Sequence, residues 1–135
     1  MKTSLTTISR ALTLVAWVAL PCLASAQAQA PNSPAVDAAK LLAAEGIAAR
    51  VVSFPSWKIF EEQTSEYKAR VLPAGVPKIA VEAGATLGWW KYVGQDGDVV
   101  GIDHFGASAP GPKVMSEFGF TGENVAARAK LRLKK

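Results

Sequence analysis

The chain has 135 residues, half of them hydrophobic, which is enough for one domain with a buried core and excludes a chain that is disordered throughout. Its net charge is +4, but residues 27–127 contain eight basic and eleven acidic residues, a net charge of −3. Because that body would repel phosphate, the sequence excludes a uniformly basic nucleic-acid-binding domain. With one cysteine, Cys22, and one histidine, His104, the chain cannot form an internal disulfide or a Cys/His zinc site.

The N-terminal segment has the pattern of an export signal. Lys2 and Arg10 precede an apolar run, residues 11–20, and small residues follow it in an A-x-A pattern. We therefore predict a signal peptide-like segment over residues 1–26 and a linker over residues 27–33. The apolar run is much shorter than the about 20 residues that span a hydrocarbon core, so no stable membrane span is expected.

A second interpretation of the apolar run stays open. Residues 11–16 (ALTLVA) also fit a buried strand of the domain, because periodicity does not distinguish a short apolar run in a leader from one in a strand. A functional leader implies a periplasmic or secreted protein, and a leader that arose by gene rearrangement implies a cytoplasmic one.

From Ser33 onward the pattern alternates between helix and strand. Ser33 followed by Pro34 predicts the start of a helix that ends near Gly46. Further along, runs of β-branched residues predict strands, and the segments between them suit short helices. In chain order we expect a strand at 49–54, helices at 55–63 and 65–72, a strand at 78–83, a helical segment at 85–92 and a strand at 99–102.

Two helices are expected near the C-terminus. The Pro-Gly-Pro run at 110–112 is incompatible with a helix interior or a central strand, so the next helix is expected at 113–118. Thr121 is expected to cap a final helix that runs from Glu123 into the basic tail. This alternation predicts parallel strands with crossover helices in a three-layer α/β/α domain.

Asp103, His104 and Ser108 are the candidates for hydrolytic chemistry. Neighbours in a strand point to opposite faces, however, so Asp103 is poorly placed to orient His104. The chain also lacks a G-x-S-x-G nucleophile elbow, and its glycines match neither of the phosphate-binding patterns G-x-G-x-x-G and G-x-x-x-x-G-K-[ST]. The favoured interpretation is a loop histidine at the end of a strand.

The aromatic residues and the basic tail have two interpretations each. The aromatic residues could stack on a ligand, but without a basic groove beside them a core or subunit contact is favoured. These aromatic residues are Trp57, Trp89, Trp90, Tyr92 and Phe105. Basic residues alternate with Ala and Leu from Arg128 onward, which favours the solvated end of a helix over a membrane or nucleic-acid surface.

Several motifs occur together in an order that is typical of one family. They are VDAAKLLAAEGIAAR (36–50), SFPSW (53–57), VLP (71–73), AVEAG (80–84), YVG (92–94), FGASAP (105–110), FGFT (118–121) and ENV (123–125). Over about 100 residues, they resemble the C-terminal domain of transketolases. The resemblance implies a transketolase C-terminal-like domain over residues 34–135 with a mostly parallel five-stranded sheet.

The same resemblance implies what the chain lacks. In that family, thiamine diphosphate, Mg²⁺ and the sugar phosphates that exchange two-carbon ketol units lie between the first two domains and across the dimer. Those domains are outside the stretch that this chain matches, so no catalytic, cofactor-binding or metal-binding residue is assigned. Glu82 of V-E-A-G is carried over only as a motif residue without a role. The implied fragment binds no cofactor, and its partners are the missing domains or a second copy.

The chain departs from the family at its start. The family's domain opens with a strand of the type L-T-L-V-A-T-G-S-E, and residues 11–16 match that strand, but residues 17–34 replace the T-G-S-E turn. Cleavage of the leader would therefore leave a sheet without its first strand, with exposed strand edges.

Three functions are consistent with the sequence. The first is a transketolase C-terminal fragment that is inactive alone. The second is an exported stand-alone module that binds a small ligand or a protein through its aromatic residues. The third is an independent enzyme that uses Asp103, His104 and Ser108.

Overall fold

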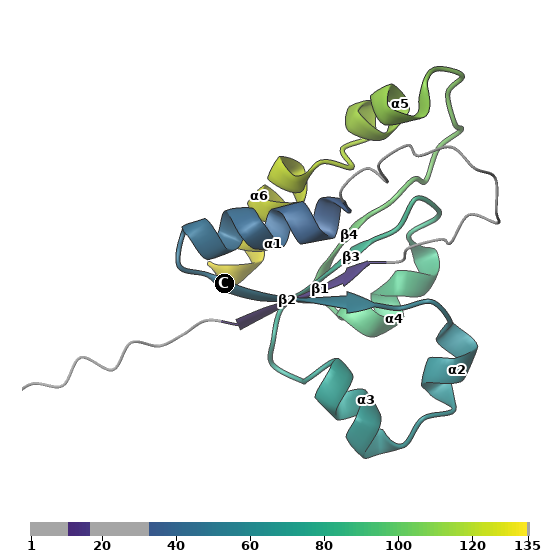
Figure 1. The fold of residues 1–135 in the computed structure, drawn as a ribbon. Helices are drawn as coiled ribbons and strands as arrows, with labels where there is room; N and C mark the ends of the chain where they lie inside the picture. Colours follow the sequence, from purple (N-terminus) through teal and green to yellow (C-terminus); the bar gives the residue numbers. More distant parts are fainter. Residues whose placement is uncertain (1–10, 17–32, 135) are drawn as a thin grey trace, which may run out of the picture.

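Four parallel strands form the sheet in the part of the chain that the structure, a computed structural model, describes: residues 11–16 and 33–134 (Figure 1). The strands are β1 (Ala11–Ala16), β2 (Ala48–Ser53), β3 (Lys78–Val81) and β4 (Asp98–Val100), in the order β2-β1-β3-β4. Apart from β1 and Ser33, the predicted leader (1–26) and linker (27–33) lie outside the described residues.

The apolar run near the N-terminus contributes the strand that lies between β2 and β3. Leu14 of β1 is in register with Val51 of β2 on one side and with Ile79 of β3 on the other. This is the arrangement that the second interpretation of residues 11–16 predicts.

Helices cover both faces of the sheet, which confirms the expected α/β class (Figure 1). On one face α1 (Pro34–Ala44) and α6 (Gly122–Leu133) pack through Leu42 and Val125 against Ile79 and Val81. On the other face η1 (Leu87–Trp89) and α4 (Trp90–Val93) pack with Ala80. Side chains alternate between the faces along β3, as they do in any strand.

The helices α2 (Trp57–Glu61) and α3 (Ser65–Val71) connect β2 to β3. Each begins after a hydroxyl residue that accepts a hydrogen bond from the first turn, because Ser56 Oγ bonds Ile59 N–H and Thr64 Oγ1 bonds Tyr67 N–H. The predicted helix at 55–63 is thus confirmed but is shorter at both ends.

The C-terminal helices confirm one prediction and correct another. Thr121 caps α6, since its Oγ1 accepts a hydrogen bond from Asn124 N–H at 3.2 Å. The helix expected to start at residue 113 is α5 (Gly111–Glu117), which begins two residues earlier. Pro112 is tolerated there because the first helical turn needs no N–H donor within the helix.

The sheet has one strand fewer, within the described residues, than the family resemblance implied. After β4, Ile102 N–H still donates to the carbonyl oxygen of Gly84 at 2.7 Å, and then residues 103–110 continue without a strand. The Asp103 side chain bonds a neighbouring loop there, and Gly106 and Pro110 do not favour an extended ladder. No helix in residues 33–134 is both long and apolar enough to cross a membrane.

Candidate functional site

A pocket of about 420 Å³ lies beyond the carboxyl ends of β2 and β3. Its lining residues are Phe54, Pro55, Trp57, Glu82, Gly84, Ala85 and Trp89. Phe54 and Pro55 directly follow β2, and Glu82 directly follows β3, so the pocket flanks the end of the strand between them, β1. In open α/β sheets, ligands bind beyond the strand ends where the chain connections diverge to the two sides. Here β1 connects to β2 and β3 connects to β4, so the connections diverge between β1 and β3, beside this pocket.

Glu82 is the charged side chain among the lining residues. Its N–H donates to Val100 O at 2.9 Å, which continues the pairing of β3 with β4. Two residues after Ala80, it lies on the face of the sheet that carries Trp89. Its side chain turns toward Gly84, where an added Cβ would lie 3.5 Å from Glu82 Oε1. Burial raises the pKa of the Glu82 carboxyl above its ordinary value.

Two indole rings form the aromatic wall of the pocket. Trp89 is 2% exposed and belongs to the core, whereas Trp57 is 42% exposed. Their ring centroids are 5.4 Å apart with an interplanar angle of 86°, an edge-to-face contact. The Trp57 ring lies directly over Gly88, where an added Cβ would lie 2.0 Å from Trp57 Cη2. The absence of a side chain at Gly88 therefore leaves the space that the Trp57 ring occupies.

The aromatic residues singled out in the sequence do not behave as one group. Trp89 lies in the core, as the favoured interpretation expected, with Tyr92 packed against it. Trp57 lines the pocket, while Trp90 and Phe105 are 44% and 98% exposed. The sequence thus predicted a core contribution but not the division between core, pocket and surface.

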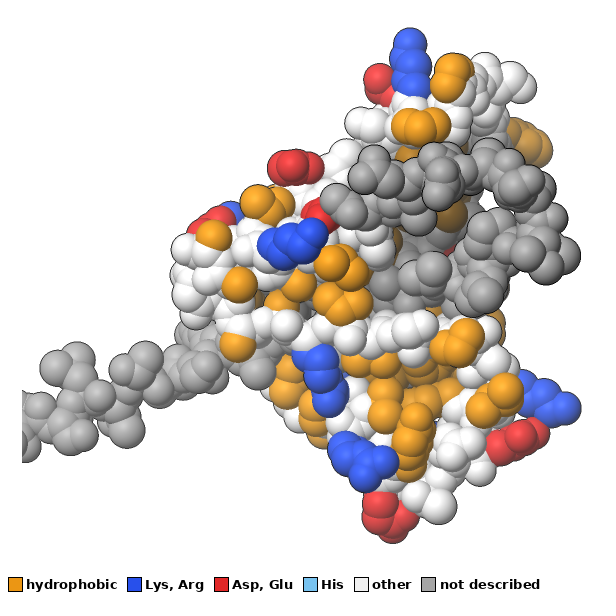
Figure 2. Space-filling model, viewed as in Figure 1, with side chains coloured by type: hydrophobic (Ala, Val, Ile, Leu, Met, Phe, Trp, Pro, Cys, Tyr) orange, Lys and Arg blue, Asp and Glu red, His pale blue; other side chains and the backbone are white. Residues whose placement is uncertain are grey.

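A second, smaller hollow of about 310 Å³ lies between β2, α2 and α3. Hydrophobic side chains gather over this region of the molecular surface, with Lys and Arg side chains beside them (Figure 2). Phe60 and Tyr67 contribute to its lining, and Arg50 borders α3 by donating hydrogen bonds to the carbonyl oxygens of Arg70 and Val71.

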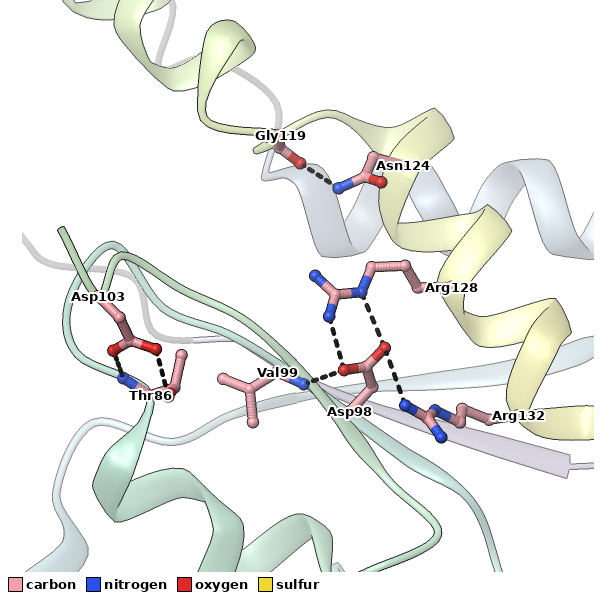
Figure 3. Close-up of polar contacts among 8 residues, drawn as sticks. All are labelled: Thr86, Asp98, Val99, Asp103, Gly119, Asn124, Arg128 and Arg132. Atoms are coloured by element: carbon pink, nitrogen blue, oxygen red, sulfur yellow. Dashed lines mark hydrogen bonds and ion pairs between the residues drawn. The ribbon is translucent and has the colours of Figure 1, made fainter.

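The Asp103 side chain joins the loop after β4 to Thr86 in the segment after β3 (Figure 3). Its Oδ1 accepts a hydrogen bond from Thr86 N–H at 2.8 Å, and its Oδ2 accepts one from Thr86 Oγ1 at 2.7 Å. These two bonds, with a smaller contribution from the charge of His104, lower the pKa of Asp103 below its usual value. Both oxygens of the Asp103 carboxylate therefore accept hydrogen bonds from the segment that follows β3.

The structure does not assemble the hydrolytic candidates. The ring of His104 contacts Phe118, with centroids 4.6 Å apart, and its Nδ1 lies 2.8 Å from the carbonyl oxygen of Phe105. Asp103 bonds Thr86 instead of the imidazole, and Ser108 is exposed in the loop. This supports the loop interpretation of His104 over a triad.

The basic C-terminal residues are only partly the solvated helix end that their pattern favoured. Arg128 and Arg132 face the domain and pair with Asp98 (Figure 3). Lys130 Nζ lies 2.8 Å from Glu45 Oε1. The same helix buries Val125 and Ala129, whereas Leu131 is 63% exposed. No three His, Cys, Asp or Glu side chains in residues 33–134 come together as a metal-binding group.

Sequence comparison identifies the family. The profile of the transketolase-like TK C-terminal domain matches residues 32–121. The chain belongs to the transketolase family. It is 58% identical over 103 residues to a transketolase of Halalkalibacterium halodurans, a match that covers 76% of this chain and 16% of the relative. It is 55% identical over 97 residues to a chloroplastic transketolase of Zea mays, covering 71% of this chain and 14% of the relative.

Solved structures give the same result for the transketolase fold. A transketolase mutant from Pichia stipitis has a TM-score of 0.76 at 37% identity, over 96% of this chain and 17% of that one. The Leishmania mexicana transketolase has the same TM-score and coverage at 36% identity. A split-gene transketolase, described as an inactive beta4 tetramer, shares the fold at a TM-score of 0.67 and 21% identity, over 93% of this chain and 40% of that one. The chain thus spans about a sixth of the length of the Halalkalibacterium halodurans and Pichia stipitis transketolases.

Proposed function

We propose that this chain is a transketolase C-terminal domain that does not transfer ketol units on its own and that functions by assembling with cofactor- and substrate-binding domains or with a second copy. The observation that carries the proposal is the extent of the match. It is confined to the C-terminal-domain profile and to 16% of the length of the bacterial relative.

The chemistry of the pocket supports the absence of thiamine diphosphate binding. A diphosphate needs cationic or N–H donors, whereas the ionisable side chain among the lining residues is the Glu82 carboxylate. That carboxylate would repel a diphosphate at close range. The lining of this pocket therefore does not suit the diphosphate of the cofactor that the family uses.

Exposed hydrophobic side chains support assembly with a partner. Phe105, in the loop after β4, is 98% exposed, and Leu87, in the segment after β3, is 85% exposed. Thr86 and Asp103, which hold these two segments together, lie next to Leu87 and near Phe105 in the chain. Large apolar side chains held on a fixed surface are typical of a protein contact. One structural neighbour, a split-gene transketolase, forms an inactive tetramer, which is consistent with this proposal.

The test uses the purified full chain. Isothermal titration with thiamine diphosphate and Mg²⁺ is expected to give no saturable heat, and an assay with xylulose 5-phosphate, the sugar in one structural neighbour, is expected to give no turnover. Saturable cofactor binding, or turnover that a Mg²⁺ chelator abolishes, would contradict the proposal. A His104→Ala variant tests the alternative of an independent enzyme that uses Asp103, His104 and Ser108. Any turnover that disappears when the imidazole is removed would support that alternative.

The location of the protein is a separate proposal. We propose that residues 1–26 are retained and that the chain is cytoplasmic, because β1 pairs with both β2 and β3. Intact mass in cytoplasmic and periplasmic fractions tests this. An uncut cytoplasmic chain supports it, whereas a soluble periplasmic species cut after Ala26, Ala28 or Ala30 would support the exported module. The pocket at the strand ends is the observation that favours this second candidate function, a small-ligand module.

A further inference from the structure

We propose that the pocket beyond β2 and β3 binds a small organic cation, an ammonium group on a flat apolar body, with the Glu82 carboxylate as its counter-ion and Trp57 as its stacking wall. This inference goes beyond the proposed function, because it assigns the domain a ligand of its own.

The first argument is the position and size of the pocket. It lies beside the point between β1 and β3 where the connections to β2 and to β4 diverge, which is the usual ligand position in an open α/β sheet. A volume of about 420 Å³ is within the range of small-molecule sites, which is about 300–1,000 Å³. A ligand of the size of an arylalkylamine fits this volume.

The second argument is the state of the Glu82 carboxylate. It is half-buried, and within the described residues no hydrogen-bond donor or cation is paired with it. Its raised pKa has the same origin, since burial opposes the charged form and no neighbour compensates. A partly buried carboxylate without a partner gains free energy when a cation binds beside it.

The third argument is the chemistry of the walls. Phe54, Trp57 and Trp89 present aromatic surface to the pocket, and indole is the aromatic group that attracts cations most strongly. An ammonium group held between a carboxylate and an indole is favoured by both, whereas an anion is disfavoured by both. The flat rings favour a flat ligand body over a flexible chain.

The fourth argument is that the wall is built into the fold. Trp57 follows the Ser56 cap of α2, and its ring contacts the buried Trp89 and lies over Gly88. A side chain at position 88 would displace that ring. The wall is thus held in place before a ligand arrives, which lowers the entropy cost of binding.

The experiment is isothermal titration of the full chain with benzylammonium, and with benzyl alcohol as the neutral probe of the same shape. We expect saturable binding of benzylammonium with a Kd of about 1 mM or tighter and binding of benzyl alcohol that is about tenfold weaker. Glu82→Gln is expected to weaken benzylammonium binding about tenfold and to leave benzyl alcohol binding unchanged. The matched control is Glu117→Gln, an exposed glutamate on α5, which should not change either affinity.

Two further variants keep the proposal testable if Glu82→Gln does not fold. Trp57→Ala and Gly88→Ala each remove the Trp57 ring from the wall and are expected to weaken benzylammonium binding. No saturable heat with benzylammonium, equal affinity for the two probes, or unchanged binding in Glu82→Gln would each overturn the proposal.

A last titration separates a free small molecule from the lysine side chain of a partner protein. N-acetyl-lysine amide carries the same ammonium group on a flexible chain. Weaker binding than that of benzylammonium supports the small-molecule form of the proposal, and tighter binding overturns that form. None of these outcomes depends on thiamine diphosphate, so failure here and failure of the proposed function are distinguishable.

Discussion

The guanidinium of Arg128 makes two parallel hydrogen bonds to the carboxylate of Asp98, from Nε to Oδ2 at 2.8 Å and from Nη2 to Oδ1 at 2.7 Å (Figure 3). Arg128 lies on α6 and Asp98 is the first residue of β4, so this pair joins the last helix to the edge of the described sheet. Arg132 adds a second cation 3.6 Å away, and Val99 N–H donates to Asp98 Oδ1 at 2.9 Å.

This ion pair predicts a pH-dependent contribution to stability. Burial on its own would raise the pKa of Asp98, but the hydrogen bonds from Arg128 and Val99, with the charges of Arg128 and Arg132, outweigh it and lower the pKa. The stabilisation is therefore full above the unfolded pKa of about 3.9 and is lost as the pH falls through the lower folded value. We expect Asp98→Asn to lower the free energy of unfolding by about 2 kcal/mol near neutral pH, and by less in acid.

Urea unfolding at neutral pH and below the ordinary pKa of Asp measures this difference. The control is Asp37→Asn, because Asp37 pairs, among the described residues, with Lys40, whose side chain is 65% exposed. Exposed pairs of this spacing contribute about 0.5 kcal/mol or less. Equal losses in the two variants, or a loss that does not shrink in acid, would contradict the role assigned to the Asp98 pair.

Local signals in the sequence predicted the elements, and the contacts between elements needed the structure. The sequence predicts Thr121 as a helix cap because a threonine just before a helix can accept a hydrogen bond from a free N–H group of the first turn, here that of Asn124. Asp98, in contrast, lies just outside the strand expected at 99–102, and nothing next to it in the sequence indicates that Arg128 will meet it. The predicted start of α5 is two residues too late, because a Pro-Gly-Pro run is incompatible with a helix interior, whereas Pro112 lies in a first turn where proline is allowed.

The candidate site likewise combines a feature that local sequence could predict with a contact between elements that it could not. The period of two along β3 places Glu82 on the face of Ala80, which the sequence could have predicted. That Trp57 lies over Gly88 could not be predicted, because α2 and η1 are brought together only by tertiary packing. Glu82 and Gly84 were therefore visible in the V-E-A-G motif, but the pocket that they line together with Trp57 was not.

Gly88 provides a test of that packing. Adding a Cβ at position 88 would place it 2.0 Å from Trp57 Cη2, so Gly88→Ala must displace the ring. We expect a loss of about 1 kcal/mol in the free energy of unfolding and a changed near-ultraviolet circular dichroism spectrum. Gly106→Ala is the matched control, since nothing lies within 4 Å of a Cβ there. Unchanged spectra in Gly88→Ala would show that the ring does not occupy the position described.

Tyr92 predicts a loss of stability at alkaline pH. Burial, and then its hydrogen bond with the negatively charged Glu61, raises the pKa of the Tyr92 hydroxyl to about 12. A raised folded pKa means that the stabilisation is full below the unfolded value of about 10 and is lost as the pH rises toward 12. In a Tyr67→Phe variant, in which Tyr92 is the remaining tyrosine, we expect tyrosinate absorbance to appear with a midpoint near 12.

Glu61 gives the control for that titration. Glu61→Gln in the same background removes the negative charge and should move the midpoint of Tyr92 ionisation to lower pH. A midpoint near the ordinary value before this substitution is made would contradict the burial of the Tyr92 hydroxyl.

The strand β1 leads to the prediction that best separates the two interpretations of the N-terminal segment. β1 is in register with β2 along its whole length and with β3 from Thr13 to Ala16, so it contributes backbone hydrogen bonds on both of its edges. Removing residues 1–26 would leave β2 and β3 separated by the width of a strand, with unpaired N–H and C=O groups on both facing edges. Rejoining them would require α1 and α6 to repack on the sheet.

We therefore expect the chain that starts at Gln27 to lose cooperative thermal unfolding, whereas a chain that lacks only residues 1–10 keeps it, because that control retains β1. Circular dichroism during heating measures both. A cooperative transition in the shorter chain would mean that the domain folds without β1, and the leader interpretation would then account for residues 1–26.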